Sequence, residues 1–117
     1  VNRSNSNTPL QALVLLNDPI YLEAARAFAQ QALQQPGQIR WAFERAIGRK
    51  PTEPEWRVLS NLHKQSLRQF QRDPTAAQGL IKVGDAATPK SLKPVPLAAM
   101  MTVTRAILNL HETITRN

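Results

Sequence analysis

Helix-start signals recur along this sequence, each a short polar residue followed directly, or after one residue, by proline. They stand at Thr8-Pro9, Asp18-Pro19, Thr52-Glu53-Pro54 and Asp73-Pro74. A short polar side chain caps the first free amides of a helix, and proline suits the first turn because its missing N–H would be unpaired there. Glu55, three residues after Thr52, completes the pattern of a capping box. The signals therefore predict a chain of several short helices.

Apolar residues between these signals recur at spacings of three and four, as the inner face of a helix requires. The clearest stripe is Ile39, Ala42, Phe43, Ala46 and Ile47, which Gly48 closes. No segment alternates for long between apolar and polar residues, as a half-buried strand would. We therefore expect an all-α domain of five or six helices, packed orthogonally or as an irregular bundle. Its centre should be the last helix, over about 96–114, because that helix is apolar on most sides.

Two further features indicate how the helices pack. The helix after Asp18-Pro19 places many small side chains inward, which implies the close approach of a neighbouring helix; its inward residues are Ile20, Ala24, Ala25, Phe28, Ala29 and Ala32. Trp41 lies to one side of its helix's apolar stripe. This position indicates either a contact with another domain or chain, or packing at the edge of the core.

The length of 117 residues fits a single domain. Residues 1–7 are mostly polar and are expected to form an extended lead-in. Residues 85–96, which hold three of the nine prolines, are expected to form a surface loop. Because the sequence opens at Val1 without an initiator Met or a signal pattern, we interpret it as part of a longer polypeptide. No window of about 18 apolar residues is present to span a membrane.

The residue types offer little for catalysis or metal binding within this chain. The absence of cysteine excludes disulfides, thiolate zinc sites, iron–sulfur clusters and covalently attached haem. His63 and His111 share no ligand spacing with each other or with a carboxylate, and we interpret both as packed or capping residues. No glycine-rich phosphate loop occurs. We therefore expect no metal site and no cofactor here, and do not predict an enzyme from this chain alone.

A basic stripe is the most pronounced feature of the charge distribution, in a chain whose net charge is +7. On the helix expected over about 54–72, four cations fall within about 80° of one another, opposite the apolar face: Arg57, Lys64, Arg68 and Arg72. Such a stripe could contact phosphates or an acidic partner, or it could be the solvated back of an amphipathic helix. It lacks the exposed aromatic residues that favour binding of single-stranded nucleic acid, so nucleic acid is not the expected partner.

One long motif resembles a known family. Arg3 is followed by Asn7-Thr8-Pro9-Leu10-Gln11-Ala12-Leu13 and then by Leu16-Asn17-Asp18-Pro19. Further matches are Ala42-Phe43, Ala46-Ile47-Gly48-Arg49, Pro51-Thr52-Glu53 and the ending Ala106-Ile107-Leu108-Asn109-Leu110. Together they resemble the C-terminal part of the planctomycete-type "domain of unknown function 1553" family. The family usually has an acid where His111 stands, so the terminus departs from its pattern.

The resemblance implies a large exported bacterial protein, located in the periplasm or at the cell surface, with a cytochrome c-like module upstream. Haem would bind only in that module, because the attachment motif Cys-x-x-Cys-His is absent from this chain. The implied partners are the other domains of the parent polypeptide. The family carries no established activity, so the resemblance alone assigns no substrate.

Three functional hypotheses follow. The leading hypothesis is a structural or domain-docking module, and the second is a segment that completes the active site of an upstream enzyme, carbohydrate-directed or redox. The third is polyanion binding through the basic stripe. The candidates for ligand or motif contacts are the polar residues of the long motif, Arg3, Asn7, Gln11, Asn17 and Asp18. Side chains of these types can also bond the backbone and lock a turn, which would make them structural.

Overall fold

The computed structural model describes residues 19–82 and 93–116, and the side chains of 22–82 and 93–111. Within these ranges the chain forms five helices and no strand: α2 (Pro19–Leu33), α3 (Gln38–Ile47), α4 (Glu53–Arg72), α5 (Pro74–Ile81) and α6 (Pro94–Arg116). The predicted all-α fold class is confirmed. The expected lead-in over 1–7, the helix after Thr8-Pro9 and most of the expected loop over 85–96 lie outside the described residues.

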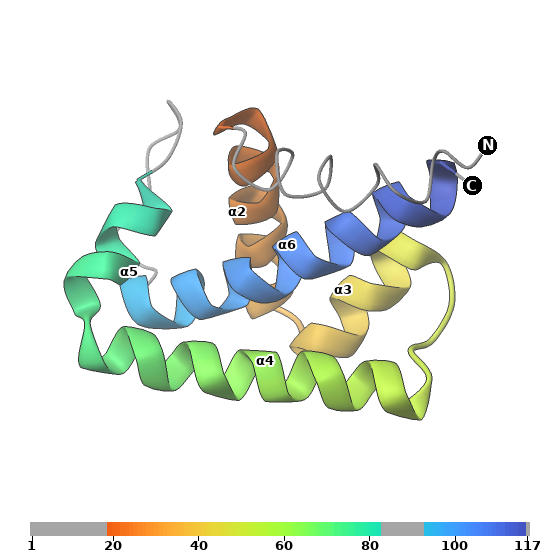
Figure 1. Ribbon diagram of the computed structural model, residues 1–117, viewed down its shortest axis with the longest axis horizontal. Coiled ribbons are helices and arrows are strands. Elements are labelled where there is room, and N and C mark those ends of the chain that lie inside the picture. Colours follow the sequence, from red (N-terminus) through yellow and green to blue (C-terminus); the bar gives the residue numbers. More distant parts are fainter. Residues whose placement is uncertain (1–18, 83–92, 117) are drawn as a thin grey trace, which may run out of the picture.

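The other helices pack against α6. It contacts α2, α3, α4 and α5, and Figure 1 shows it crossing the middle of the fold, with α4 alongside it in the opposite direction. Its wholly buried residues are Leu97, Ala98, Ala99, Met100, Met101, Val103, Thr104 and Ile107. Seven of them are apolar, more than any other described helix contributes to the core, and their burial removes apolar area from water. The predicted central position of the C-terminal helix is therefore confirmed.

The start of α6 differs from the prediction. The helix begins at Pro94, so the expected loop over 85–96 is wrong at its C-terminal end. Pro94 and Pro96 both fall in the first turn, where backbone N–H groups have no partner within the helix and proline loses nothing. The N–H of Leu97 donates to the carbonyl of Lys93 at 3.2 Å and begins the helical hydrogen bonding.

Several predicted helix starts and stops are formed by the residues that the sequence pattern indicated. Gly48 ends α3 in the left-handed conformation, with φ at 87°, which costs glycine little because it has no Cβ. The capping box of α4 is present: the N–H of Glu55 donates to Thr52 Oγ1 at 3.3 Å, and the N–H of Thr52 donates to Glu55 Oε1 at 2.8 Å. Asp73 caps α5 by accepting from the N–H of Ala76 at 3.2 Å.

The alanine face of α2 lies against α6, as expected. Ala25, Ala29 and Ala32 are fully buried, and the hydroxyl of Thr104 on α6 lies 2.9 Å from the carbonyl oxygen of Ala25, to which it donates. Small side chains allow this close approach of two helix backbones. Ala24, by contrast, is exposed, so its predicted burial is wrong. It lies about 100° around the helix from Ala25, off the stripe that faces α6.

Trp41 packs at the edge of the core. Its ring centroid lies 5.7 Å from that of Phe28 in a tilted arrangement, and its side chain is half-buried against the core cluster. Aromatic pairs at this separation are stabilising beyond the area that they bury. The structure therefore shows Trp41 packed at the edge of the core, and a contact of its exposed part with another domain or chain stays a prediction.

Candidate functional site

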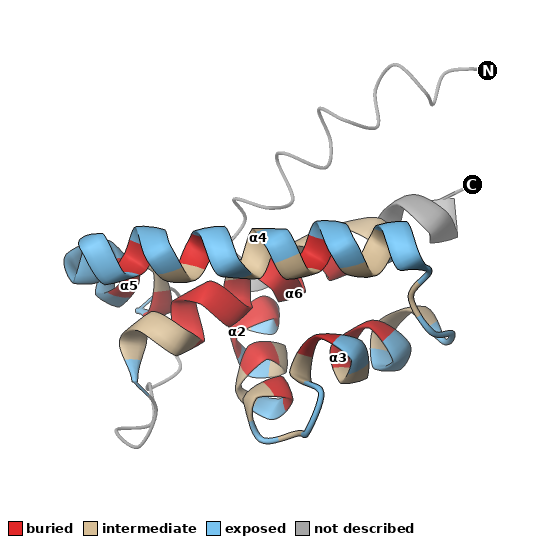
Figure 2. Ribbon diagram, turned by 90° about the horizontal axis from the view of Figure 1, so that it is seen from below, coloured by how far each residue is buried: buried red, intermediate tan, exposed pale blue. Residues whose placement is uncertain are grey.

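Of the two sets of predicted site residues, the structure describes the basic stripe but not the polar residues of the long motif. Arg3, Asn7, Gln11, Asn17 and Asp18 lie outside the described residues. The four cations of the stripe all lie on α4 and are exposed. Figure 2 shows the exposed side of α4 running along the length of the helix. We call Arg57, Lys64, Arg68 and Arg72 the basic row.

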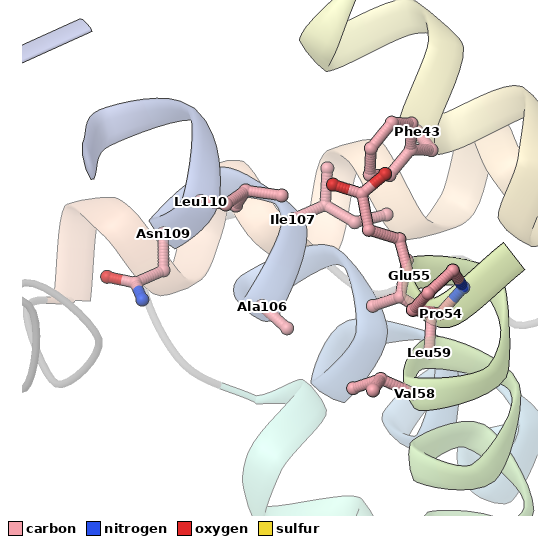
Figure 3. Close-up of a pocket in the computed structure, with 9 residues that line it drawn as sticks. All are labelled: Phe43, Pro54, Glu55, Val58, Leu59, Ala106, Ile107, Asn109 and Leu110. Carbon is pink, nitrogen blue, oxygen red and sulfur yellow. The ribbon is translucent and has the colours of Figure 1, made fainter. Parts of the chain in front are cut away.

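An apolar groove opens beside the N-terminal end of this row, where the first half of α4 meets the second half of α6 and the second half of α3. Its volume is about 400 Å³, and Figure 3 shows its lining; the apolar lining residues are Phe43, Pro54, Val58, Leu59, Ala106, Ile107 and Leu110. Val58 is 65% exposed, and it is the exposed large apolar residue of the described part of the chain. Concave surfaces of this size that are lined mainly by apolar side chains are typical of binding sites.

A second groove of about 580 Å³ continues along α4, between α4, α5 and α6. Leu62 and Phe70 lie in its apolar part, whereas Gln65, Gln69 and Arg105 contribute polar groups. Val58, Leu62, Gln65 and Gln69 follow one another at spacings of three and four, so both grooves lie on one flank of α4. We call the two grooves together the α4–α6 seam.

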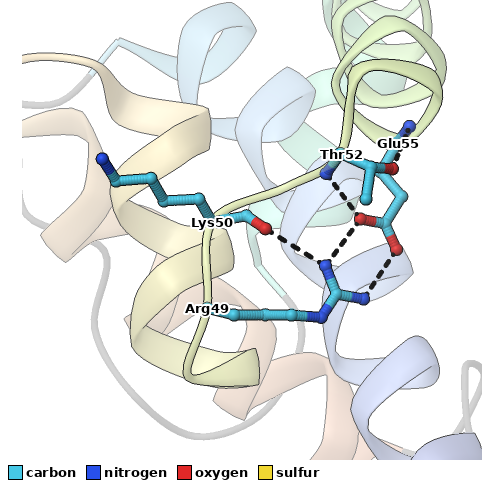
Figure 4. A network of polar contacts seen from close by, with 4 residues as sticks. All are labelled: Arg49, Lys50, Thr52 and Glu55. Carbon is cyan, nitrogen blue, oxygen red and sulfur yellow. Dashed lines mark hydrogen bonds and ion pairs between the residues drawn. The ribbon is translucent and has the colours of Figure 1, made fainter.

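A polar network closes one end of the seam (Figure 4). Both guanidinium Nη atoms of Arg49 donate to the carboxylate of Glu55, each at 2.9 Å, and Arg49 also donates to the carbonyl of Lys50 at 3.1 Å. The hydrogen bonds from Arg49, and those from Thr52, lower the pKa of Glu55 to about 2. Glu55 is therefore ionised at neutral pH, with its oxygens occupied, which is unsuited to a general acid.

The Glu55→Gln variant is expected to reduce the free energy of unfolding by about 0.5–1 kcal/mol at pH 7, because it removes a bidentate but partly exposed ion pair. Since the pKa of Glu55 is lower in the folded state than its ordinary value of 4.5, its contribution is complete above pH 4.5. That contribution disappears as the pH falls towards 2, the folded-state pKa. Urea unfolding of both proteins at pH 7 and near pH 2 measures the difference.

Glu53→Gln is the matched control, because Glu53 is an exposed acid in the same turn that makes no ion pair with the described residues. It is expected to change stability by less than about 0.5 kcal/mol at either pH. An equal loss in both variants would contradict a specific role for the Arg49–Glu55 pair.

The histidines do not form a metal site in the described part of the chain. His63 is half-buried on the other flank of α4, where it lines a hollow with Trp56 and Ser60, and its burial lowers its pKa. His111 is exposed. Among the described residues no group of three or more His, Cys, Asp or Glu side chains could hold a metal ion. Likewise, none of the helices described has the length and apolar character needed to cross a membrane.

Arg26 is a buried residue that was not among the predicted site residues. It is 2% exposed, and its Nη1 donates to the carbonyl of Ile81, the last residue of α5. Carbonyls at a helix C-terminus have no partner within the helix, and a cation there is favourable. The available signal was its position three residues before Ala29, on the alanine face of α2.

Comparison with known proteins gives one match. A family model described as "PSD1: Protein of unknown function (DUF1553)" matches residues 1–63, more than half of the chain. The matched residues include α2, α3 and the first half of α4, and thus one wall of the apolar groove, whereas α5 and α6 lie beyond them. No curated protein and no solved structure is significantly similar to the chain.

Proposed function

This chain belongs to the DUF1553 family of proteins of unknown function, and we propose that it is a helical module that docks other domains of a larger polypeptide. The observation that carries the proposal is the apolar groove, with Val58 65% exposed at its rim. Covering such a surface with a partner removes apolar area from water, which favours association.

The chemistry of the groove supports binding rather than catalysis. Glu55 is the ionisable residue among those described as lining it, and its carboxylate is held by Arg49 and Thr52. The alternative, in which the chain completes an upstream active site, depends on the long motif that includes Arg3 and Asp18. That motif lies outside the described residues, and no observation within them favours this alternative.

The setting that we propose for the module is an exported protein in the periplasm or at the cell surface, with any haem held by another domain. Family membership is the support for this setting. Within the chain itself there is no cysteine for covalent haem attachment.

Thiol labelling of a Val58→Cys variant tests the docking proposal. The sequence contains no cysteine, so the introduced thiol is the single reactive one in the isolated chain. Labelling by a maleimide requires an accessible thiol, so the reaction is expected to slow by about tenfold or more when the chain is part of the full-length polypeptide. The rates are measured by mass spectrometry, with the full-length polypeptide lacking the substitution as background.

A Gln31→Cys variant provides the control, because Gln31 is exposed on α2 and does not line either groove of the seam. Its labelling rate is expected to be similar in the two contexts. If the Val58→Cys variant also reacts equally fast in both, no other domain covers the groove and the docking proposal is wrong.

A further inference from the structure

We infer that the α4–α6 seam binds an amphipathic helix with an acidic edge, an inference that rests on the proposed docking function and names the chemistry of the partner. The observation behind it is the position of the basic row. Arg57 lies beside the apolar groove, whereas Lys64, Arg68 and Arg72 lie beside the second groove. The second groove is partly polar and includes Arg105, so the seam as a whole presents apolar side chains beside a line of positive charge.

The geometry of α4 places the row and the seam side by side. At about 100° per residue, the seam residues Val58 and Gln65 lie between the basic row on one side and the buried residue Phe70 on the other. The seam extends on α4 from Pro54 to Phe70, which corresponds to about 24 Å along the helix axis. A partner helix of about 15 residues would span that length.

The charge of the row is not balanced by the rest of α4. No acidic residue occurs between Trp56 and Arg72, and none of the four cations makes an ion pair or hydrogen bond with the described part of the chain. Lys64, Arg68 and Arg72 also follow one another at intervals of four residues, an arrangement that destabilises an isolated helix by like-charge repulsion. Acidic residues on a partner would relieve this repulsion and set the orientation of binding.

The same features disfavour other occupants of the seam. Residues 1–18 of this chain carry Arg3 and Asp18 as their charged residues and so offer no acidic edge. A second copy would bring two chains of net charge +7 together and place like charges across the interface. A simple polyanion would leave the apolar side chains of Val58 and Leu62 uncovered. An amphipathic helix with an acidic edge can place apolar side chains in the groove and acidic side chains beside the basic row at the same time.

Two designed helical peptides of about 15 residues test the inference. Both carry leucines along one face; one has glutamates along the adjacent edge, and the other has glutamines in the same positions. Binding to the chain is measured by fluorescence anisotropy. At about 0.1 M salt the acidic peptide is expected to bind about tenfold more tightly, and the difference should shrink at about 1 M salt, where the Debye length falls from about 10 to about 3 Å.

Three variants of the chain assign the binding to its parts. Replacing Lys64 and Arg68 together by glutamine is expected to abolish the preference for the acidic peptide. The double variant Arg45→Gln, Lys50→Gln removes the same charge from exposed residues on α3 and the following turn, and should keep the preference. Val58→Asp is expected to abolish the binding of both peptides, because it places a charge at the apolar rim of the groove, which the leucine face of either peptide would cover.

Three other results would contradict the inference, and each points to a different explanation. If both peptides bind equally well and Val58→Asp abolishes that binding, the groove binds an apolar partner without selecting for its charge. The acidic edge would then be wrong, and the proposed docking function would stand. Binding of the acidic peptide that survives Val58→Asp, and that poly-glutamate or polyuridylate displaces equally well, would assign the row to general polyanion binding. Binding of neither peptide would refute the acidic helix, while the labelling of the Val58→Cys variant would still decide the docking function.

Discussion

Replacing Phe43 by alanine is expected to lower the free energy of unfolding by about 3–5 kcal/mol, a large share of the stability of a domain of this size. Phe43 has the largest of the fully buried side chains and belongs to the core cluster with residues of α4 and α6. The guanidinium carbon of Arg49 lies 5.3 Å from the centre of its ring, so the loss also removes a cation–π contact. Urea unfolding followed by far-UV circular dichroism measures the effect, provided that the slope m is unchanged.

Two further variants show whether the loss of stability in Phe43→Ala comes from the cavity that the substitution leaves in the core. Phe43→Leu keeps much of the volume and is expected to cost less than about 1.5 kcal/mol. Val58→Ala removes apolar atoms from an exposed side chain and should change stability by less than about 0.5 kcal/mol. If Phe43→Ala were as mild as Val58→Ala, α3 would not pack on α4 and α6 as described.

Replacing Arg26 by methionine is expected to lower the free energy of unfolding by about 1.5–3 kcal/mol. Methionine retains much of the apolar stem but cannot donate a hydrogen bond, so the buried contact to the carbonyl of Ile81 is lost at the end of α5. The effect should concentrate on α5, because Arg26 on α2 is bonded to that helix's last residue. Hydrogen exchange of the α5 amides is therefore expected to accelerate more than that of α4.

Arg68→Met is the matched control, since Arg68 is an exposed residue of the basic row. Its expected effect on stability is below about 0.5 kcal/mol, with no change in the exchange of α5. Unchanged protection of α5 in the Arg26→Met variant would contradict the role of Arg26 in holding the end of that helix.

Local signals were sufficient for most of the helix ends. Thr52 with Glu55, Asp73 before Pro74, and Gly48 each act through backbone groups within a few residues, so their roles can be predicted without knowing the rest of the fold. The start of α6 was predicted too late because two prolines fall close together there. Proline indicates a helix start or a loop equally well until the packing of the following residues is known.

Residues whose environment comes from distant helices could not be assigned in the same way. The alanine face of α2 was recognised, but the burial of Arg26 depends on the end of α5, 55 residues further along the chain. The hydroxyl of Thr104 similarly meets a carbonyl 79 residues away. No pattern within one helix reports which polar group of another helix it will meet.

The sequence by itself determined the helices, the apolar core helix, the family and the basic row, because caps, periodicity and charge spacing act within one helix or one motif. Only the tertiary structure decided that an apolar groove lies beside that row. The groove exists because α4 and α6 pack alongside each other next to α3, and their packing leaves Val58 of α4 exposed at the edge of the groove. Its floor combines side chains such as Phe43 and Ile107, far apart in the sequence, and their meeting is a property of packing rather than of local pattern.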